Sequence, residues 1–527
     1  MTAALRVRRS LEDLQNDYQA GNKTELENLM RAWRGIQALP ADDQKSFFVL
    51  GGYHGEPFRG AGWGNAAYWG GYCNHGNVLF PTWHRVYLLK LEDALRSIPG
   101  CQDVTLPFWD ETSENSLKHG IPWALTEEKF MLDGEEIDNP LRSFTFPVNI
   151  VDHLTSGDDP NYSKPRGYQT VRYPLSGLVG PDDREATERH NANFPDATTN
   201  TALLNANIVA WLNSSIVVEG QRINTNVHDL FVQCLNAPNY TVFSNTTSAA
   251  AFNDNAAVKV VPLEKPHNSI HLAVGGFDVP KEGDFSPIPG ANGDMGENDT
   301  AGFDPIFFFH HCFIDRVFWL WQQRHGSTEQ LEIIAGYPGT NSVDGQGPTP
   351  GTAPNSWLGV DSPLDPFMMD APQGPRTFTS RDCVNIETQL GYTYGPFSLE
   401  GGSLLSAAAL PVEASHRVHV TGIDRTNIAG SFVVALYRNV GGERHLVDSE
   451  PVLSRWHVEG CANCQTHLKA SAVFVVPKSL GVPLSGEGLE VVVHTRDGVL
   501  GGTPRLLSVG DPGKGSKFRL RVEPLDL

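Results

Sequence analysis

The chain has 527 residues, which is too long for one ordinary hydrophobic core and favours two domains. Its hydrophobic content of 40% is that of a soluble globular protein, and its formal net charge is -21 at pH 7. An acidic surface argues against nucleic acid and anionic membranes as partners, because both would repel it. We also find no apolar stretch of about 18 residues, so no membrane-spanning helix is predicted.

No apolar run follows Arg8 and Arg9, so a secretory or twin-arginine signal is not expected in this chain. We therefore expect a cytoplasmic protein, although a mature form that has lost its signal would have the same sequence. The segment up to Gln44 spaces its leucines at threes and fours, which predicts packed amphipathic helices.

A loop rich in glycine and aromatic residues comes next, and it contains His54, Cys73 and His75. The pattern becomes helical at Pro81, a residue that suits the first turn of a helix. His84 is therefore expected early on this helix. The three histidines come from one loop and the helix that follows it.

A second pair, His267 and His271, lies four residues apart in the segment from Leu263 to Gly276. Pro266 would start a helix here and the glycines would end it, so both imidazoles would lie on one face within reach of one ion. The spacing alone is a weak signal, since 18 histidines in a chain of this length give about 0.6 such pairs by chance.

The stretch from Phe303 to Gln323 is apolar and aromatic over several helical turns, yet it contains His310, His311 and Asp315. Consecutive helical residues point about 100° apart, so the two histidines are not expected to face the same point. Asp315 lies four residues after His311 and shares its face, where it could hydrogen-bond a neighbouring group. The alternative is a buried helix with two satisfied histidines.

The chain thus offers two groups of three histidines. Ligation by imidazoles alone suits copper and zinc, and three neutral imidazoles leave a coordination position open for catalysis. Two such groups facing each other would form a two-metal centre with ions about 3.5–4 Å apart. The groups are His54, His75 and His84, and His267, His271 and His311.

Two segments resemble the copper motifs of the tyrosinase, catechol oxidase and haemocyanin family. HGNVLFPTWHRVYLLKLE, from His75 to Glu92, is similar to the first motif, and DPIFFFHHCFID, from Asp304 to Asp315, is similar to the second. With the ligands between them, the resemblance covers residues 1–395. It implies a mainly α catalytic domain, built as a four-helix bundle around two copper ions.

The resemblance also assigns the copper ligands. It implies that His311, seven residues after Asp304, is a ligand rather than His310. One copper ion would be held by His54, His75 and His84, and the other by His267, His271 and His311.

Cys73-Asn74-His75 resembles a Cys-x-His element that in fungal and molluscan members becomes a thioether between the cysteine sulfur and the imidazole carbon. Such a link would fix the ring of His75, which otherwise sits on a glycine-rich loop and would lose entropy on binding copper. The alternative for Cys73 is a free buried thiol.

Glu264 and Asn268, which flank His267, match positions proposed in the family to hold a water that takes the proton of a phenol. Phenols titrate near pH ~10, so a base at the site would help hydroxylation. The alternative for Glu264 is an exposed carboxylate before a helix, favoured by the helix dipole. Together, the two residues favour tyrosinase over catechol oxidase.

The family binds dioxygen at its dicopper centre, and its enzymes act on small phenolic substrates. The resemblance therefore implies a tyrosinase, which hydroxylates monophenols and oxidises o-diphenols to o-quinones. The alternatives are a catechol oxidase without hydroxylation and an oxygen carrier. A single copper unit, rather than tandem repeats of it, weighs against the carrier. The preferred phenol and the formation of a homo-oligomer are left open.

LGYTY, from Leu390 to Tyr394, resembles the tyrosine motif that closes the family's catalytic domain, often paired with an N-terminal arginine such as Arg8 or Arg9. We predict a catalytic domain over residues 1–395 and a linker over 396–411. Short β-branched runs separated by turn residues then predict a β-sandwich over residues 412–527. In latent members of the family such a domain is a lid over the copper site.

Two features of this lid carry further predictions. Phe474 is either a plug in the entrance to the copper site or a core residue of its strand. Cys461 and Cys464 form a C-x-x-C pair, and thiolates favour cuprous copper, so the pair is a candidate for copper loading. The alternatives for this pair are a local disulfide or a zinc site.

Overall fold

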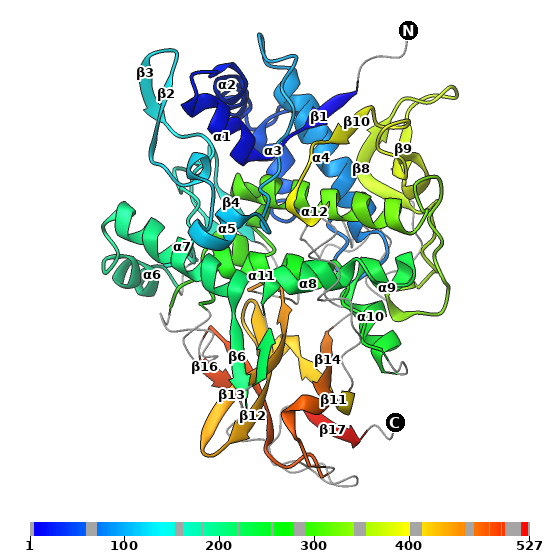
Figure 1. Cartoon of the computed structure of the whole chain (residues 1–527). Helices are drawn as coiled ribbons and strands as arrows, with labels where there is room; N and C mark the ends of the chain where they lie inside the picture. The colour runs from blue at the N-terminus through cyan, green and yellow to red at the C-terminus, as the bar shows by residue number, and fades with distance from the viewer. Residues whose placement is uncertain are drawn as a thin grey trace.

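The computed structural model describes residues 5–58, 71–152, 162–180, 183–218, 221–224, 226–254, 258–278, 290–341, 355–400, 414–456, 458, 468–483, 485–496, 498–500 and 518–524. Figure 1 shows a helical part in the upper half and a strand-rich part below it, with α11 and α8 near the boundary. The prediction of a helical core followed by a strand-rich C-terminal domain is confirmed.

The helical part is formed by α1 (Leu11–Gln19), α2 (Thr24–Gln37), α3 (Phe47–Gly52), α4 (Phe80–Arg96), α5 (Glu114–His119), α6 (Arg184–Asn191), α7 (Ala197–Asn213), α8 (Val227–Cys234), α9 (Tyr240–Ser244), α10 (Thr246–Asn253), α11 (Glu264–Gly275) and α12 (Ile306–Arg324). Small two-stranded sheets lie on it: β1 (Arg6–Arg8) with β10 (Tyr392–Tyr394), β2 (Lys129–Leu132) with β3 (Glu135–Asp138), β4 (Ile150–Asp152) with β5 (Tyr162–Lys164), β6 (Ser215–Val218) with β7 (Gln221–Asn224), and β8 (Pro363–Met369) with β9 (Arg376–Thr379).

Helix α12 lies at the centre of the helical part. Almost all of its residues are buried, so it is apolar around its whole circumference, as expected for a core helix. Aromatic rings from α2, α3 and α4 pack on Phe308, namely those of Trp33, Phe47 and Tyr87. The N-terminal helices are amphipathic as predicted, and Ser10 caps α1 by accepting a hydrogen bond from the Asp13 amide.

A buried polar cluster connects α12 to the strands β1 and β10, which come from the N-terminal and C-terminal ends of the helical part. The Oδ1 atom of Asp315 accepts a hydrogen bond from Arg85 Nε at 2.6 Å, and its Oδ2 atom accepts from the hydroxyl groups of Tyr392 and Tyr394 at 2.6 and 2.7 Å. Arg8 stacks on the Tyr392 ring at 3.7 Å, and β1 pairs in parallel with β10. Of the two arginines considered for the tyrosine motif, Arg8 is therefore the partner.

The strand-rich part contains two sheets. One has the order β14–β11–β17, formed by Lys469–Pro477, Ala414–Asp424 and Arg519–Pro524. The other has the order β13–β12–β15–β16, formed by Glu443–Val452, Phe432–Val440, Leu489–Thr495 and Gly498–Leu500. All of these pairs are antiparallel, and alternate residues of both sheets bury one common apolar cluster.

The two parts of the molecule are in direct contact. Strand β13 packs against α11, and β14 packs against α10, so the strand-rich part covers the side of the helical core that carries α11. Most of the predicted linker lies outside the described residues, which end at Glu400 and resume at Ala414. Among the described helices, none is both long and apolar enough to span a bilayer.

Candidate metal centre

Three helices and two loop positions bring the predicted histidines together. His84 lies in α4, which begins at Phe80 with Pro81 in its first turn, as the sequence predicted. His267 and His271 lie one turn apart in α11, which begins at Glu264, two residues before the expected Pro266. His311 lies in α12, while His54 follows α3 directly and His75 precedes α4.

The second group of histidines has its ring nitrogens close together. The Nε2 atoms of His267 and His271 each lie 3.2 Å from the Nε2 atom of His311. A nitrogen of His310 also lies within 4.8 Å of the others, so the structure brings both adjacent histidines to this group. His310 differs from His311 because its Nδ1 atom is 2.5 Å from a buried carboxylate oxygen of Glu111.

The first group contains His54, His75 and His84, with ring nitrogens within 4.8 Å of one another. Within the described residues, the Nε2 atoms of all three are buried and have no hydrogen-bond partner. A buried polar atom without a partner is costly, and a cluster of such imidazole nitrogens facing one another is the arrangement expected of metal ligands.

Backbone carbonyls determine which nitrogen of three histidines is protonated. The carbonyl oxygens of Phe80, Met295 and Asn298 lie 2.8, 2.8 and 3.1 Å from the Nδ1 atoms of His84, His271 and His54. A carbonyl only accepts, so each Nδ1 must donate, and the Nε2 lone pair is left for a metal. The Nδ1 atom of His267 similarly contacts the Asn268 side-chain oxygen at 2.9 Å.

The two groups face each other across a short distance. The ring of His84 stacks on that of His311 with centroids 4.5 Å apart, and the His75 and His267 rings are 5.4 Å apart. Burial lowers the pKa of His84 to about 3 and that of His271 to about 4, and it lowers the pKa values of the other histidines of both groups well below the usual range. All are therefore neutral at pH 7, as metal ligation requires.

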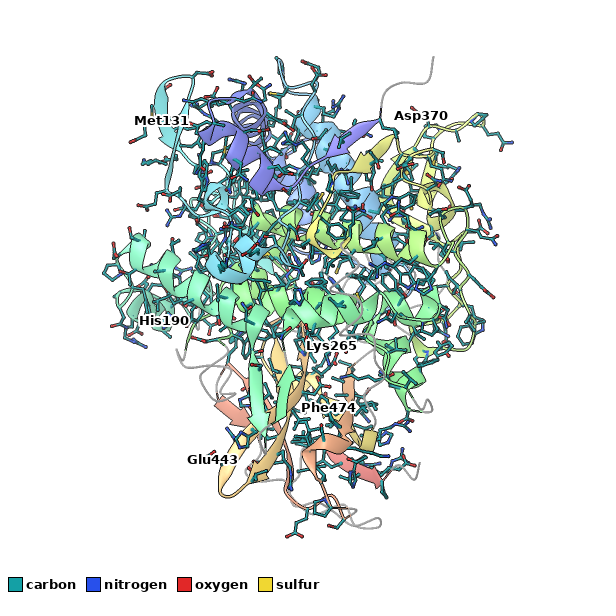
Figure 2. All side chains as sticks on the ribbon, viewed as in Figure 1. Met131, His190, Lys265, Asp370, Glu443 and Phe474 are labelled. Atoms are coloured by element: carbon teal, nitrogen blue, oxygen red, sulfur yellow. The ribbon has the colours of Figure 1, made fainter. Side chains whose placement is uncertain are left out.

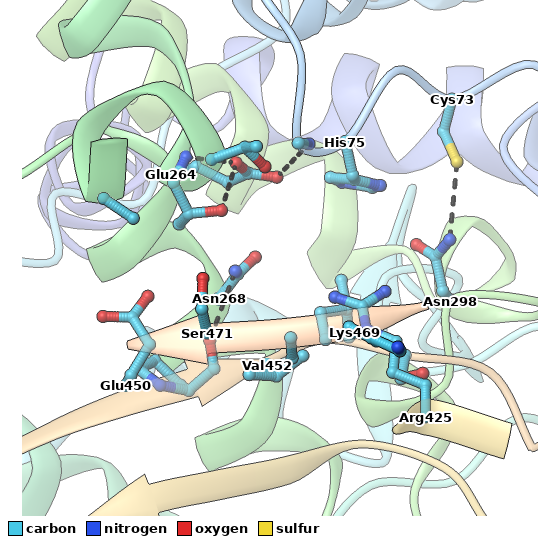
Figure 3. Close-up of a pocket in the computed structure, with 18 residues that line it drawn as sticks. Cys73, His75, Glu264, Asn268, Asn298, Arg425, Glu450, Val452, Lys469 and Ser471 are labelled. Atoms are coloured by element: carbon cyan, nitrogen blue, oxygen red, sulfur yellow. Dashed lines mark hydrogen bonds between the residues drawn. The ribbon is translucent and has the colours of Figure 1, made fainter. Parts of the chain in front are cut away.

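A cavity of about 100 Å³ lies beside His75, between the helical core and the strand-rich part (Figure 3). The core side of this cavity includes Glu264 and Asn268, so the structure brings the two predicted catalytic residues to one place. The opposite wall comes from the strand-rich part and includes Arg425, Lys469 and the segment 450–454.

Glu264 is buried rather than exposed, so the surface-carboxylate alternative is wrong. Its Oε1 atom accepts from the Gly76 amide at 2.8 Å, and its Oε2 atom accepts from the amide and hydroxyl groups of Thr246 at 2.8 and 3.0 Å. Burial raises the pKa of Glu264, although these hydrogen bonds oppose the shift. The carboxylate thus also holds the loop that carries His75.

Cys73 is buried beside the first group, and Figure 3 shows its side chain directed toward Asn298. Its Sγ atom accepts a hydrogen bond from the Asn298 side-chain amide at 3.4 Å. The thioether to His75 stays a prediction. Cys461 and Cys464, the candidate pair for copper loading, lie outside the described residues.

Phe474 does not plug the cavity. Its side chain is fully buried in the apolar cluster that the two sheets share, where Figure 2 labels it within the strand-rich part. The alternative interpretation, a core residue of its strand, is the one observed. The end of β13 and the residues after it, Glu450 to Ser454, face the cavity instead.

Sequence reasoning missed several residues that orient the histidines. Glu111 and Asn298 are 199 and 244 residues away in the sequence from His310 and His54, the histidines that they contact. Met295 is nearer to its histidine, His271, at 24 residues. No local pattern distinguishes a carbonyl that accepts from a histidine from any other carbonyl.

Two facing groups of buried imidazoles, set in a helical core and covered by a strand-rich domain, define a candidate dinuclear metal protein. The sequence profile of the common central domain of tyrosinase matches residues 44–324. The chain is 53% identical over 498 residues to the tyrosinase HcTyr2 of Hahella sp. (strain CCB-MM4), with 90% of this chain and 88% of that relative covered. The chain therefore belongs to the tyrosinase family, a family of copper enzymes.

Other relatives agree with this assignment. A tyrosinase of Aspergillus oryzae is 47% identical over 491 residues, covering 88% of this chain and 87% of its own. The structure of a tyrosinase from Burkholderia thailandensis at low pH superposes with a TM-score of 0.79 at 52% identity, covering 93% of this chain and 94% of that one. The apo-protyrosinase melB of Aspergillus oryzae, at 17% identity and a TM-score of 0.62 over 98% and 92% of the two chains, shares the fold.

Proposed function

We propose that this protein is a latent tyrosinase, which uses dioxygen to hydroxylate monophenols and to oxidise o-diphenols to o-quinones. The observation that carries the proposal is the pair of facing histidine groups, in which His54, His84 and His271 have their Nε2 atoms freed by Nδ1 contacts to carbonyls. Membership of the tyrosinase family and relatives named tyrosinase support the same activity.

The donor set fits copper. The groups contain imidazole nitrogens without a thiolate or carboxylate among the predicted ligands, which is the ligand type that copper and zinc prefer. When bound, two copper ions supply the redox chemistry with dioxygen that the side chains cannot provide. The proposed ligands are His54, His75 and His84 for one ion, and His267, His271 and His311 for the other.

His310 is not among the proposed ligands, although its ring reaches the second group. Its Nδ1 atom is engaged by Glu111, and its ring stacks on His267 with centroids 5.1 Å apart. We assign it the role of packing and orienting the His267 ring. The predicted four-helix bundle is proposed to consist of α2, α4, α11 and α12; contacts of α2 with α4, of α4 with α12 and of α12 with α11 support this proposal.

Glu264 and Asn268 are the proposed residues for proton removal from a phenol. Both line the cavity beside His75, and the Asn268 side-chain oxygen contacts Nδ1 of His267 at 2.9 Å. A carboxylate and an amide at this place could hold a water that accepts the phenolic proton, which brings a group with a pKa near ~10 into reaction at neutral pH. Small phenols and dioxygen are thus the proposed reaction partners.

One observation favours a second candidate, a catechol oxidase without hydroxylation. Both oxygens of Glu264 already accept hydrogen bonds from Gly76 and Thr246, so the carboxylate has a structural function whether or not it binds a water. Oxidation of an o-diphenol makes a smaller demand on a base than hydroxylation of a monophenol does.

The strand-rich part is the proposed lid, with the domain boundaries as predicted: catalytic domain 1–395, linker 396–411 and lid 412–527. Its segment from Glu450 to Ser454 lines the cavity beside His75, and the volume of about 100 Å³ is below the ~300–1,000 Å³ of typical ligand pockets. Substrate entry therefore requires the lid to move or to be removed.

The proposed function is tested by oxygen consumption of the copper-loaded chain with a monophenol and, separately, with the matching catechol. Each substrate is tested before and after limited proteolysis in the linker, and a His267→Ala variant serves as the control for chemistry at the metal centre. We expect both substrates to be oxidised and proteolysis to raise both rates. Oxidation of the catechol alone would support the second candidate, and reversible oxygen binding without turnover would support an oxygen carrier.

A further inference from the structure

We infer that the lid helps to hold the first metal site, in addition to covering it, because Ser454 and Arg455 fix the carbonyl that orients His54. This inference rests on the proposed function, in which His54 is a copper ligand. The residues concerned belong to a buried segment, 291–304, which lies between α11 and α12 in the sequence and leads into α12. We call it the bracing segment.

The bracing segment contacts one histidine of each group. The carbonyl of Met295 accepts from Nδ1 of His271, and the carbonyl of Asn298 accepts from Nδ1 of His54. Hydrogen bonds of this kind fix the tautomer and the ring orientation of a metal-binding histidine, and their loss typically costs ~10–100-fold in metal affinity. The position of this segment therefore bears on both sites.

The lid holds the Asn298 end of the segment. The backbone amide of Asn298 donates a hydrogen bond to the backbone carbonyl of Ser454 at 3.1 Å. The guanidinium of Arg455 forms a buried ion pair with Asp299, the next residue along, and its Nη2 atom lies 3.8 Å from the Sγ atom of Cys73. Groups of the lid thus contact Asn298, Asp299 and Cys73, which lie close to the first group of histidines.

The helical core approaches the same point with little room to adjust. The Glu56 amide donates to the carbonyl of Asp299 at 2.9 Å. A Cβ atom at Gly55 would lie 2.2 Å from that carbonyl oxygen and 2.8 Å from the carbonyl oxygen of Asn298. The loop that carries His54 therefore packs backbone to backbone on the bracing segment, and a shift of the segment is transmitted to His54.

The Met295 end has anchors in the core that do not depend on the lid. The carboxylate of Asp294 accepts from the Tyr168 hydroxyl at 2.6 Å, the Val171 amide at 2.8 Å and the Thr300 hydroxyl at 2.9 Å. The lid contacts this end as well: Arg496 donates to the carbonyls of Ala291 and Gly296, and the Ser431 hydroxyl donates to that of Gly296. Because the core anchors this end independently, loss of the lid should affect His54 more than His271, and the first copper ion more than the second.

The test is copper retention by the full-length chain. Wild type, Arg455→Met, Arg455→Lys and the control Arg444→Met are loaded with copper, and bound copper per chain is followed during dialysis against a chelator. Arg444 belongs to the same domain, but its guanidinium lies over the Tyr437 ring at 4.4 Å, and it has no contact with the bracing segment among the described interactions. Thermal unfolding is recorded in parallel to show that each variant is folded.

We expect Arg455→Met to lose one of its two copper ions at least ~10-fold faster than wild type, while the second ion is retained. The rate of copper loss from Arg455→Lys should lie between those of Arg455→Met and wild type, because lysine keeps the positive charge but lacks the planar set of guanidinium donors. Arg444→Met should lose copper at the wild-type rate. In a His54→Ala background, Arg455→Met should cause no further loss, because the histidine through which it acts is absent.

A folded Arg455→Met variant that retains both ions like wild type would overturn the inference, as would equal acceleration of the loss of both ions. If this variant does not fold, wild type cleaved in the linker gives the same comparison: faster loss of one ion supports the inference, and unchanged retention overturns it. A wild-type chain that binds no copper would instead overturn the proposed function, so the two failures are distinguished by the control.

Discussion

A cluster of ion pairs holds the lid on the helix that carries two of the proposed ligands. Lys265 of α11 lies 3.2 Å from a carboxylate oxygen of Asp448 and 3.2 Å from one of Glu450, both on β13 of the lid. Lys259 also pairs with Asp448. We expect Asp448→Asn to loosen the closed lid, since two ammonium groups of the core lose their shared carboxylate while the size of the side chain is kept.

The magnitude follows from the pKa of Asp448. Burial alone would raise this pKa, but the charges of Lys259 and Lys265 outweigh burial and lower it to about 2. In an open lid the exposed carboxyl would have an ordinary pKa of about 3.9, and a difference of this size corresponds to about 2–3 kcal/mol in favour of the closed form. The asparagine variant should therefore populate the open form ~80-fold more.

The sign of the pH dependence follows from the same difference. The pKa of Asp448 is depressed in the closed form, so its contribution is fully present above pH ~4 and is lost as the pH falls from ~4 through about 2. Wild type should therefore open its lid in acid. The variant has no carboxyl group at this position, so this part of its pH response should be absent.

The assay is oxygen uptake with a catechol by the uncleaved, copper-loaded chain at neutral pH. The matched control is Glu443→Gln, because Glu443 is an exposed carboxylate at the start of the same strand, and Figure 2 shows it far from Lys265. We expect a higher rate for Asp448→Asn only. An unchanged rate would refute the reasoning, and so would an increase that persists after the lid has been removed.

Three further predictions concern the core. Asp315→Asn should destabilise the fold by ~3–5 kcal/mol in denaturant unfolding, because it leaves Arg85 buried without its carboxylate, and a change below ~1 kcal/mol would contradict this. Glu264→Gln should lower the monophenol rate ~100-fold but spare the catechol rate, and an equal loss of both would point to a structural role. His267→Ala should reduce bound copper by one ion per chain in metal analysis, and retention of both ions would exclude His267 as a ligand.

Local information was sufficient to predict the helices that carry the proposed ligands. Pro81 lies in the first turn of α4, and the four-residue spacing of His267 and His271 reflects one turn of α11, so both were readable from a few neighbouring residues. The family resemblance supplied the assignment of His311, which helical geometry had left open. The structure then placed nitrogens of both adjacent histidines near the second group.

Contacts between distant parts of the chain could not be predicted in this way. His54 and Asn298 are 244 residues apart, and His310 and Glu111 are 199 apart, so no periodic pattern links them. The interpretation of Phe474 was undecided for a related reason. An alternating strand shows that a side chain faces one side of a sheet, but only the packing of the second sheet shows that this side is the core of the lid.

The lid contacts at the two ends of the site have different consequences for activation. The ion pairs of Asp448 act on α11 near His267, whose Nδ1 atom contacts Asn268 of the same helix. The lid also contacts this amide, but the hydrogen bond from Asn268 Nδ2 to the Pro451 carbonyl is long at 3.4 Å, so loosening the ion pairs should open the cavity with little disturbance of that ligand. The contacts of Ser454 and Arg455 act on Asn298, which orients His54 from outside its own loop. Weakening the ion pairs of Asp448 should therefore increase activity with little loss of copper. Complete removal of the lid should increase activity and, at the same time, weaken retention of the first ion, so a mild opening of the lid should give the more durable enzyme.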